Sequence, residues 1–210
     1  TYPDGIKGIS ASVQRDPIEI SVEDSHHSPD IEQVFFKVEK SERIQTLFNV
    51  LAHYQPESTL IFCNTKQQCH DLSGELRELD LHALALHGDL EQFERDQVLA
   101  QFSGKSSSIL IATDVAARGL DVKELAAVIN FELSRDPEVH IHRIGRTARA
   151  GSKGLAVSLF TSSDKRHLQV IEEYQGSDAK IVSTATLTVA ANFKLYPLMV
   201  TLFVNGGRKD

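Results

Sequence analysis

Short apolar runs alternate with amphipathic segments through the middle of the chain. The runs that have the length of buried strands are 31–38, 59–63, 82–86, 108–112, 126–131 and 155–160. The segments predicted as helices from their apolar spacing are 41–54, 66–79, 92–102, 140–149 and 163–174. Because strands that alternate with helices form βαβ units, the pattern predicts an α/β domain from about Ile31 to Tyr174. We expect it to be doubly wound, with a mostly parallel sheet and helices on both faces.

The two ends of the chain do not follow this alternation. The stretch HHSPD at 26–30 is polar and contains proline, which indicates a linker after residues 1–25. After Gln175 the strand–helix rhythm stops, and VTLFVNGGRKD at 200–210 is typical of one strand entering a turn. We therefore expect three parts: a linker over 1–30, the domain over 31–174 and a tail over 175–210.

Composition narrows the class of protein. The chain has 210 residues, 41% of them hydrophobic, and a formal charge of −7, so a generally basic nucleic-acid-binding surface is excluded. No apolar run approaches the roughly 18–20 residues of a membrane span, and no secretory leader is recognisable. Cys63 and Cys69 are too few for a disulfide framework or a zinc ribbon, and the histidines lack a matching ligand cluster, so no metal site is expected. These features favour a cytoplasmic protein without a membrane partner.

Polar turns follow three of the predicted strands. Asn64 comes after 59–63, Gly88 after 82–86, and Thr113 and Asp114 after 108–112, with Gly119 close behind. In parallel α/β sheets ligands bind at the carboxyl ends of the strands, so we expect these turns to share one edge. The alternative interpretation is that they only cap helices and make tight turns.

The stretch HRIGRTARAG at 142–151 places arginines three residues apart. In a helix, Arg143, Arg146 and Arg149 would form a cationic ridge along one side, at a cost of about 0.2–0.5 kcal/mol per like-charged pair. Guanidinium groups suit bidentate contacts with phosphate, so the ridge indicates a polyphosphate ligand. The alternative is a solvated face that Asp136 and Glu138 partly neutralise.

Several motifs in order resemble one family. ATDVAARGLD (112–121) and HRIGRTARAG (142–151) are similar to motifs five and six of DEAD-box RNA helicases, and LIFCNT (60–65) resembles motif four. Gln92 and Arg95 match the family's Gln-x-x-Arg element. The resemblance implies a second, RecA-like domain of an ATP-dependent RNA helicase. ATP would bind between it and a first domain, which carries the phosphate loop, the Mg²⁺ ligands and the Asp-Glu-Ala-Asp carboxylates. None of these motifs occurs in the sequence, so we expect the chain alone not to hydrolyse ATP.

The resemblance also implies residue roles. Arg146 and Arg149 would be catalytic arginine fingers that face the γ-phosphate, and Gly119 and Asp121 would complete the ATP site, with Asp121 on the ribose. The residues that would couple the ATP and RNA sites are Arg118, His142 and Arg143. The residues that would lie along the RNA backbone are Asn64, Gly88, Gln92, Arg95, Thr113, Asp114 and Gly119.

Two other functions stay open at this point: a DNA-directed helicase of the same superfamily, and an adaptor that binds RNA or protein without ATPase activity. The opening TYPDGI resembles the stretch that begins at the last residue of the family's Ser-Ala-Thr motif, which implies that 1–30 holds the end of a first helicase domain and the linker after it. The closing 200–210 resembles the start of the RNA-binding domain in the bacterial DbpA-like subgroup. That last resemblance implies a large-subunit ribosomal RNA target and a role in ribosome assembly.

Overall fold

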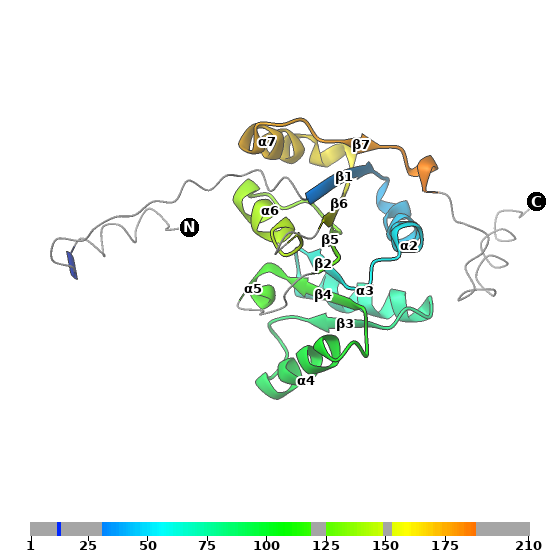
Figure 1. Cartoon of the computed structure of the whole chain (residues 1–210), viewed down its shortest axis with the longest axis vertical. Helices are drawn as coiled ribbons and strands as arrows, with labels where there is room; N and C mark the ends of the chain where they lie inside the picture. The colour runs from blue at the N-terminus through cyan, green and yellow to red at the C-terminus, as the bar shows by residue number, and fades with distance from the viewer. Residues whose placement is uncertain (1–11, 14–30, 119–124, 149–152, 188–210) are drawn as a thin grey trace, which may run out of the picture.

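A parallel sheet of seven strands organises the residues that a computed structural model describes, namely 12–13, 31–118, 125–148 and 153–187 (Figure 1). The strands are β1 (Ile31–Lys37), β2 (Thr59–Cys63), β3 (Ala83–Leu86), β4 (Ile109–Thr113), β5 (Ala127–Asn130), β6 (Gly154–Phe160) and β7 (Ile181–Val182). Their order in the sheet is β3-β4-β2-β5-β6-β1-β7, and every neighbouring pair is parallel. The predicted doubly wound α/β fold is confirmed.

Helices cover both faces of the sheet (Figure 1). They are η1 (Lys40–Glu42), α2 (Arg43–Tyr54), α3 (Lys66–Glu78), α4 (Gln92–Ser103), α5 (Asp114–Ala117), α6 (Pro137–Ile144), η2 (Ser162–Asp164), α7 (Lys165–Gln175) and η3 (Thr184–Thr186). Helices α2 and α3 lie on one face, and α4, α5, α6 and α7 lie on the other. Each face therefore has its own apolar layer.

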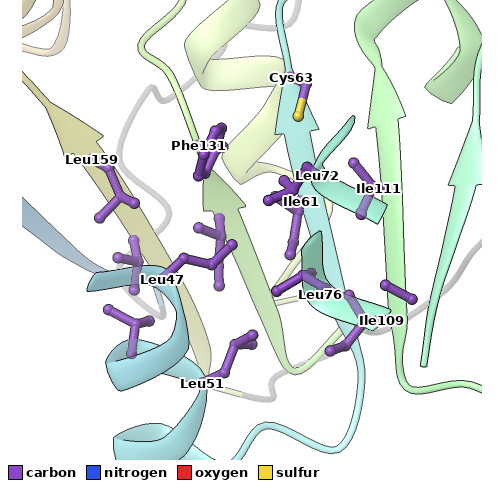
Figure 2. Packing of buried hydrophobic residues seen from close by; sticks show 14 of the residues in the cluster. Leu47, Leu51, Ile61, Cys63, Leu72, Leu76, Ile109, Ile111, Phe131 and Leu159 are labelled. Atoms are coloured by element: carbon purple, nitrogen blue, oxygen red, sulfur yellow. The ribbon is translucent and has the colours of Figure 1, made fainter. Parts of the chain in front are cut away.

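The side chains of β2 show how one strand serves both layers. Ile61 and Cys63 point to the α2/α3 layer, whereas Leu60 and Phe62 point to the layer under α4 and α5. This follows from the alternation of side chains along a strand, and it explains why the whole run 59–63 is buried. In Figure 2, leucines from α2 and α3 pack against Ile61 and its neighbours in the sheet. Full burial of one such side chain contributes about 1.5–3 kcal/mol.

The segment assigned to the tail adds the seventh strand. Ile181 and Val182 pair in parallel with Phe35 and Phe36 of β1, and Leu187 is buried in the α2/α3 layer. The domain therefore extends at least to Leu187 and does not end at Tyr174. The expectations for 200–210 and for the linker over 14–30 fall outside the described residues.

Candidate functional site

The three polar turns lie side by side at the carboxyl edge of the sheet. Strands β3, β4 and β2 are consecutive in the sheet order and parallel, so the turns after Leu86, Thr113 and Cys63 emerge at one edge. The hydroxyls of Thr65 and Thr113 accept hydrogen bonds from the backbone N–H groups of Gln68 and Ala116, which caps α3 and α5. The turns after β2 and β4 thus cap helices, and all three turns lie at one edge of the sheet.

Arg143 is the best-connected polar side chain at this edge, and it is only 2% exposed. Its Nε donates to Asp114 Oδ1 at 2.7 Å, and its Nη2 donates to Asp114 Oδ2 and Asn64 Oδ1, each at 2.8 Å. Its Nη1 donates to the Glu132 carbonyl at 2.9 Å and to Asn130 Oδ1 at 3.2 Å. The guanidinium also lies over the Phe62 ring, 5.2 Å from its centroid. All five donors of the arginine are used, so Arg143 holds strand ends together and has no donor left for a phosphate.

The predicted ridge of three arginines is wrong. Helix α6 spans Pro137–Ile144 rather than 140–149, so Arg146 lies in the turn that follows the helix. Thr147 causes this ending, because its hydroxyl donates to the Leu125 carbonyl and its backbone forms an isolated bridge with Leu125. The chain leaves the helix, and Ala148 takes a left-handed φ of 53°. Arg143 points inward and is neutralised by Asp114, so the expected repulsion does not arise.

A groove of about 520 Å³ lies between α5 and α6. The residues of its lining that concern the site are Asp114, Arg118, His142, Arg143 and Arg146. The structure thus places Arg118, His142 and Arg143, the residues expected to couple the two sites, in one groove with Arg146. Arg149, Gly119 and Asp121 fall outside the described residues.

The residues expected along the RNA differ in how the protein engages them. Asn64 is held at both ends of its amide, because its Oδ1 accepts from Arg143 and its Nδ2 donates to the Leu133 carbonyl at 3.3 Å. Gln92 donates to Asp96 on its own helix at 2.8 Å. Arg95 donates to the Ala116 carbonyl at 3.3 Å and so links α4 to α5. Gly88 is exposed, and within the described part of the chain nothing beyond its sequence neighbours lies within 4 Å of a Cβ built at this position.

Sequence reasoning missed a second layer of polar residues behind Arg143. Glu132 accepts a hydrogen bond from Arg43 Nη1 at 2.8 Å, and Arg43 is only 8% exposed. Asn130 donates to the Ser158 hydroxyl at 3.0 Å while its Oδ1 accepts from Arg143. Glu132 follows the end of β5. The rule that polar residues at the carboxyl ends of parallel strands form the site would therefore have found it, as it found the residues after β2, β3 and β4. Arg43 carries no such signal, because its partner is distant in sequence.

His140 on α6 is completely buried and stacks on Phe35, with ring centroids 6.0 Å apart. Among the described residues neither ring nitrogen has a hydrogen-bond partner. Burial, and then the nearby charge of Arg143, lower the pKa of His140 to about 3. The imidazole is therefore neutral in the folded domain at physiological pH.

The cysteines are free and buried, as the sequence indicates. A hydrogen bond between the two thiols and then burial raise the pKa of Cys63 far above its ordinary value. In the ranges that the structure covers, no group of three or more potential metal ligands is found. No helix of these ranges is long and apolar enough to cross a bilayer.

Comparison with known proteins settles the family. Residues 39–151 match the family described as the helicase conserved C-terminal domain, which is more than half of the chain. The chain belongs to this family.

Relatives of this helicase domain are DEAD-box proteins. The chain is 45% identical to the ATP-dependent RNA helicase DbpA of Escherichia coli over 212 residues, covering 100% of the chain and 45% of DbpA. A DEAD-box protein of Methanococcus jannaschii superposes with a TM-score of 0.69 at 37% identity, over 87% of the chain and 49% of that protein. Saccharomyces cerevisiae Dbp5 L327V bound to RNA and ADP BeF3 gives a TM-score of 0.79 at 28% identity, over 89% and 50% respectively. The chain thus spans about half the length of these proteins, and the recognition as a DEAD-box C-terminal, RecA-like domain is confirmed.

Proposed function

We propose that this domain completes an ATP site and an RNA site in a full-length DEAD-box RNA helicase, which uses ATP to unwind short duplexes. The observation that carries the proposal is the division of labour between two arginines of one motif. Both arginines line the groove between α5 and α6, but Arg143 is buried and spends all five donors on the protein, whereas Arg146 is half-buried in the turn after α6. The catalytic finger is therefore assigned to Arg146 and, from the motif, to Arg149.

ATP is the proposed nucleotide. The fingers stabilise negative charge on the transferring phosphoryl group, an effect worth about 10³- to 10⁵-fold in rate in related phosphoryl-transfer enzymes. Gly119 and Asp121 complete the nucleotide contacts, with Asp121 accepting from the ribose. Mg²⁺ enters only through the first domain, whose motifs the chain lacks. This domain alone is accordingly proposed to be inactive as an ATP hydrolase.

RNA is proposed to run along the carboxyl edge formed by the turns after β2, β3 and β4. The side-chain oxygens of Asn64 and Asp114 are held by Arg143, so we assign these turns to contacts through main-chain N–H groups and nearby donors. Such contacts read the backbone of a single strand and do not need a basic surface, which agrees with the net charge of −7. The Dbp5 structure with RNA and ADP BeF3 supports a fold that serves both ligands.

The cellular setting is proposed from sequence alone. A cytoplasmic location agrees with the two free cysteines. Large-subunit ribosomal RNA and a role in ribosome assembly depend on the DbpA-like character of residues 200–210, and the 45% identity to DbpA supports that character.

The finger assignment is tested by Arg146→Ala in the full-length protein, with RNA-stimulated ATP turnover and ATP binding measured in parallel. We expect turnover to fall about 10³-fold or more, because the charge on the transferring group loses its partner. ATP binding is expected to change only a few-fold. The matched control is Arg166→Ala on the exposed surface of α7, which should turn over ATP normally. Turnover near the wild-type rate in Arg146→Ala would contradict the assignment.

A further inference from the structure

A second buried arginine lies behind the Arg143 cluster, on the opposite face of the sheet. Arg43 is the first residue of α2, which packs in the α2/α3 layer, whereas Arg143 belongs to α6 on the other face (Figure 1). No motif described above contains Arg43. Its guanidinium nevertheless reaches the same edge of the sheet, since its Nη1 lies 2.8 Å from Glu132 Oε1.

Glu132 connects the two arginines. Its carboxylate accepts from Arg43, and its main-chain carbonyl accepts from Arg143 Nη1 at 2.9 Å. The residue follows the end of β5, where Phe131 donates to the Phe62 carbonyl at 3.0 Å, and it lies in an irregular segment. The Glu132 carbonyl is thus held by side-chain contacts rather than by the sheet. Arg143 contacts this carbonyl, and Arg43 holds the carboxylate of the same residue.

Further contacts hold Arg43 itself in place. Its guanidinium carbon lies 5.6 Å from the centroid of the Phe131 ring, and its Nη2 lies 3.8 Å from Asp164 Oδ2. The Arg43 side chain is 9% exposed, against 30% for Glu132 and 24% for Asp164. A charge this well buried is expensive unless it is paired, so the pair with Glu132 persists in the folded domain.

We propose that the Arg43–Glu132 pair is a positioning pair for the RNA-binding edge. The pair fixes the position of Glu132, whose main-chain carbonyl orients Arg143. Arg143 in turn holds Asn64 after β2 and Asp114 after β4, which lie in two neighbouring turns of that edge. The pair is proposed to act through Arg143 and not through direct contact with RNA or ATP. This inference rests on the proposed function and deepens it, because it names residues outside the helicase motifs that set the affinity for RNA.

The test uses the full-length protein and a single-stranded RNA oligonucleotide. Glu132→Gln keeps the carbonyl and the shape of the side chain but removes its charge, and Arg43→Met removes the guanidinium. In each variant we expect the RNA concentration for half-maximal ATPase stimulation to rise about tenfold, the scale of coupling within one hydrogen-bonded network. KM for ATP should change less than twofold. Arg43→Lys should restore most of the RNA response, since it keeps a cation within reach of Glu132.

Controls separate positioning from a general loss of structure. Glu32 on β1 forms an exposed ion pair with Lys180, with 2.7 Å between Glu32 Oε1 and Lys180 Nζ. The variant Glu32→Gln removes this pair and should leave the RNA response unchanged. The double variant Arg43→Met/Glu132→Gln should raise the half-maximal RNA concentration no further than the more strongly affected single variant does, because both changes break the same ion pair. Thermal unfolding of every variant identifies any that fails to fold.

Two results would overturn the inference. One is a folded Glu132→Gln protein whose half-maximal RNA concentration lies within twofold of wild type. The other is a double variant whose effect is the sum of the singles. Failure of the proposed function is distinguishable, since the wild-type protein would then show no RNA-stimulated turnover at all.

Discussion

At the scale of single residues, the site is organised by a buried charge. Burying a guanidinium is costly unless its charge is paired, and Arg143 is paired with Asp114 and makes further contacts to the ends of β2 and β5. The motif HRIGRTARAG therefore contains an arginine that builds the edge and at least one, Arg146, that lines the groove. The family resemblance already gave the two arginines different expected roles, coupling for Arg143 and catalysis for Arg146. It could not show that Arg143 is held by five hydrogen bonds inside the protein, because those contacts depend on the packing of α6 against the strand ends.

His140 makes stability depend on pH. Its pKa is about 3 in the folded domain, against an ordinary value of 6.5, so the unfolded chain takes up a proton that the folded domain refuses. The contribution of His140 to the free energy of unfolding is fully present above pH 6.5. It is lost as the pH falls towards 3, by about 1.4 kcal/mol per pH unit.

The variant His140→Phe removes this dependence and keeps a ring against Phe35. We expect the free energy of unfolding of the variant, measured with urea from pH 8 to pH 5, to fall less steeply with pH than that of wild type. At pH 8 the variant should be at least as stable, because a buried N–H without a partner is removed. The control is His70→Gln, whose parent side chain is 77% exposed and which should keep the wild-type slope. Equal slopes for His140→Phe and wild type would refute the buried neutral histidine.

At the scale of elements, the end of α6 depends on close packing against the start of β6. A Cβ on Gly154 would lie 2.5 Å from Thr147 Oγ1 and 2.6 Å from the Ala148 nitrogen, both far inside contact distance. Only glycine leaves room there for the turn that follows Arg146. This requirement lies between two segments that are separate in the sequence pattern, so the periodicity of 140–149 predicted a longer helix.

Gly154→Ala should therefore destabilise the domain by about 1–3 kcal/mol, as overpacking usually does. Urea unfolding measures the change. Gly74→Ala is the matched control, because Gly74 lies on the exposed side of α3 with nothing within 4 Å of its Cβ position. That control should stabilise the domain by about 0.5–1 kcal/mol, the usual preference for alanine over glycine in a helix. A Gly154→Ala domain as stable as wild type would show that the turn can move without cost.

Most elements followed from the apolar pattern, and the exceptions have physical reasons. The strand runs 59–63 and 155–160 agree with β2 and β6 within a residue because both are mostly apolar and are buried on both faces. Strand β7 has only two residues, Ile181 and Val182, and its place is decided by pairing with β1 rather than by its own periodicity. The shared edge of three turns was predictable because the carboxyl ends of parallel strands lie at one edge, whereas the Arg43–Glu132 pair was not, because it joins residues 89 positions apart.

At the scale of the whole molecule, the relatives of the chain are about twice its length. It covers 45% of DbpA and 50% of Dbp5, and its own motifs supply arginines and strand-end turns but no phosphate loop. In the proposed function the site is divided between two domains, and this domain would contribute transition-state stabilisation and RNA contacts only when the other domain closes on it. The acidic net charge and the local cluster of arginines are compatible in such an arrangement, because only the facing edge has to be cationic.

The measurement that tests this account most directly is ATP turnover, with and without RNA, by the 210-residue chain and by the full-length gene product under the same conditions. The account predicts no turnover from the chain alone and RNA-stimulated turnover from the full-length protein, with a weaker response to DNA of the same sequence. Turnover by the isolated chain would contradict a site divided between two domains, and it would require a phosphate-binding site other than the groove between α5 and α6.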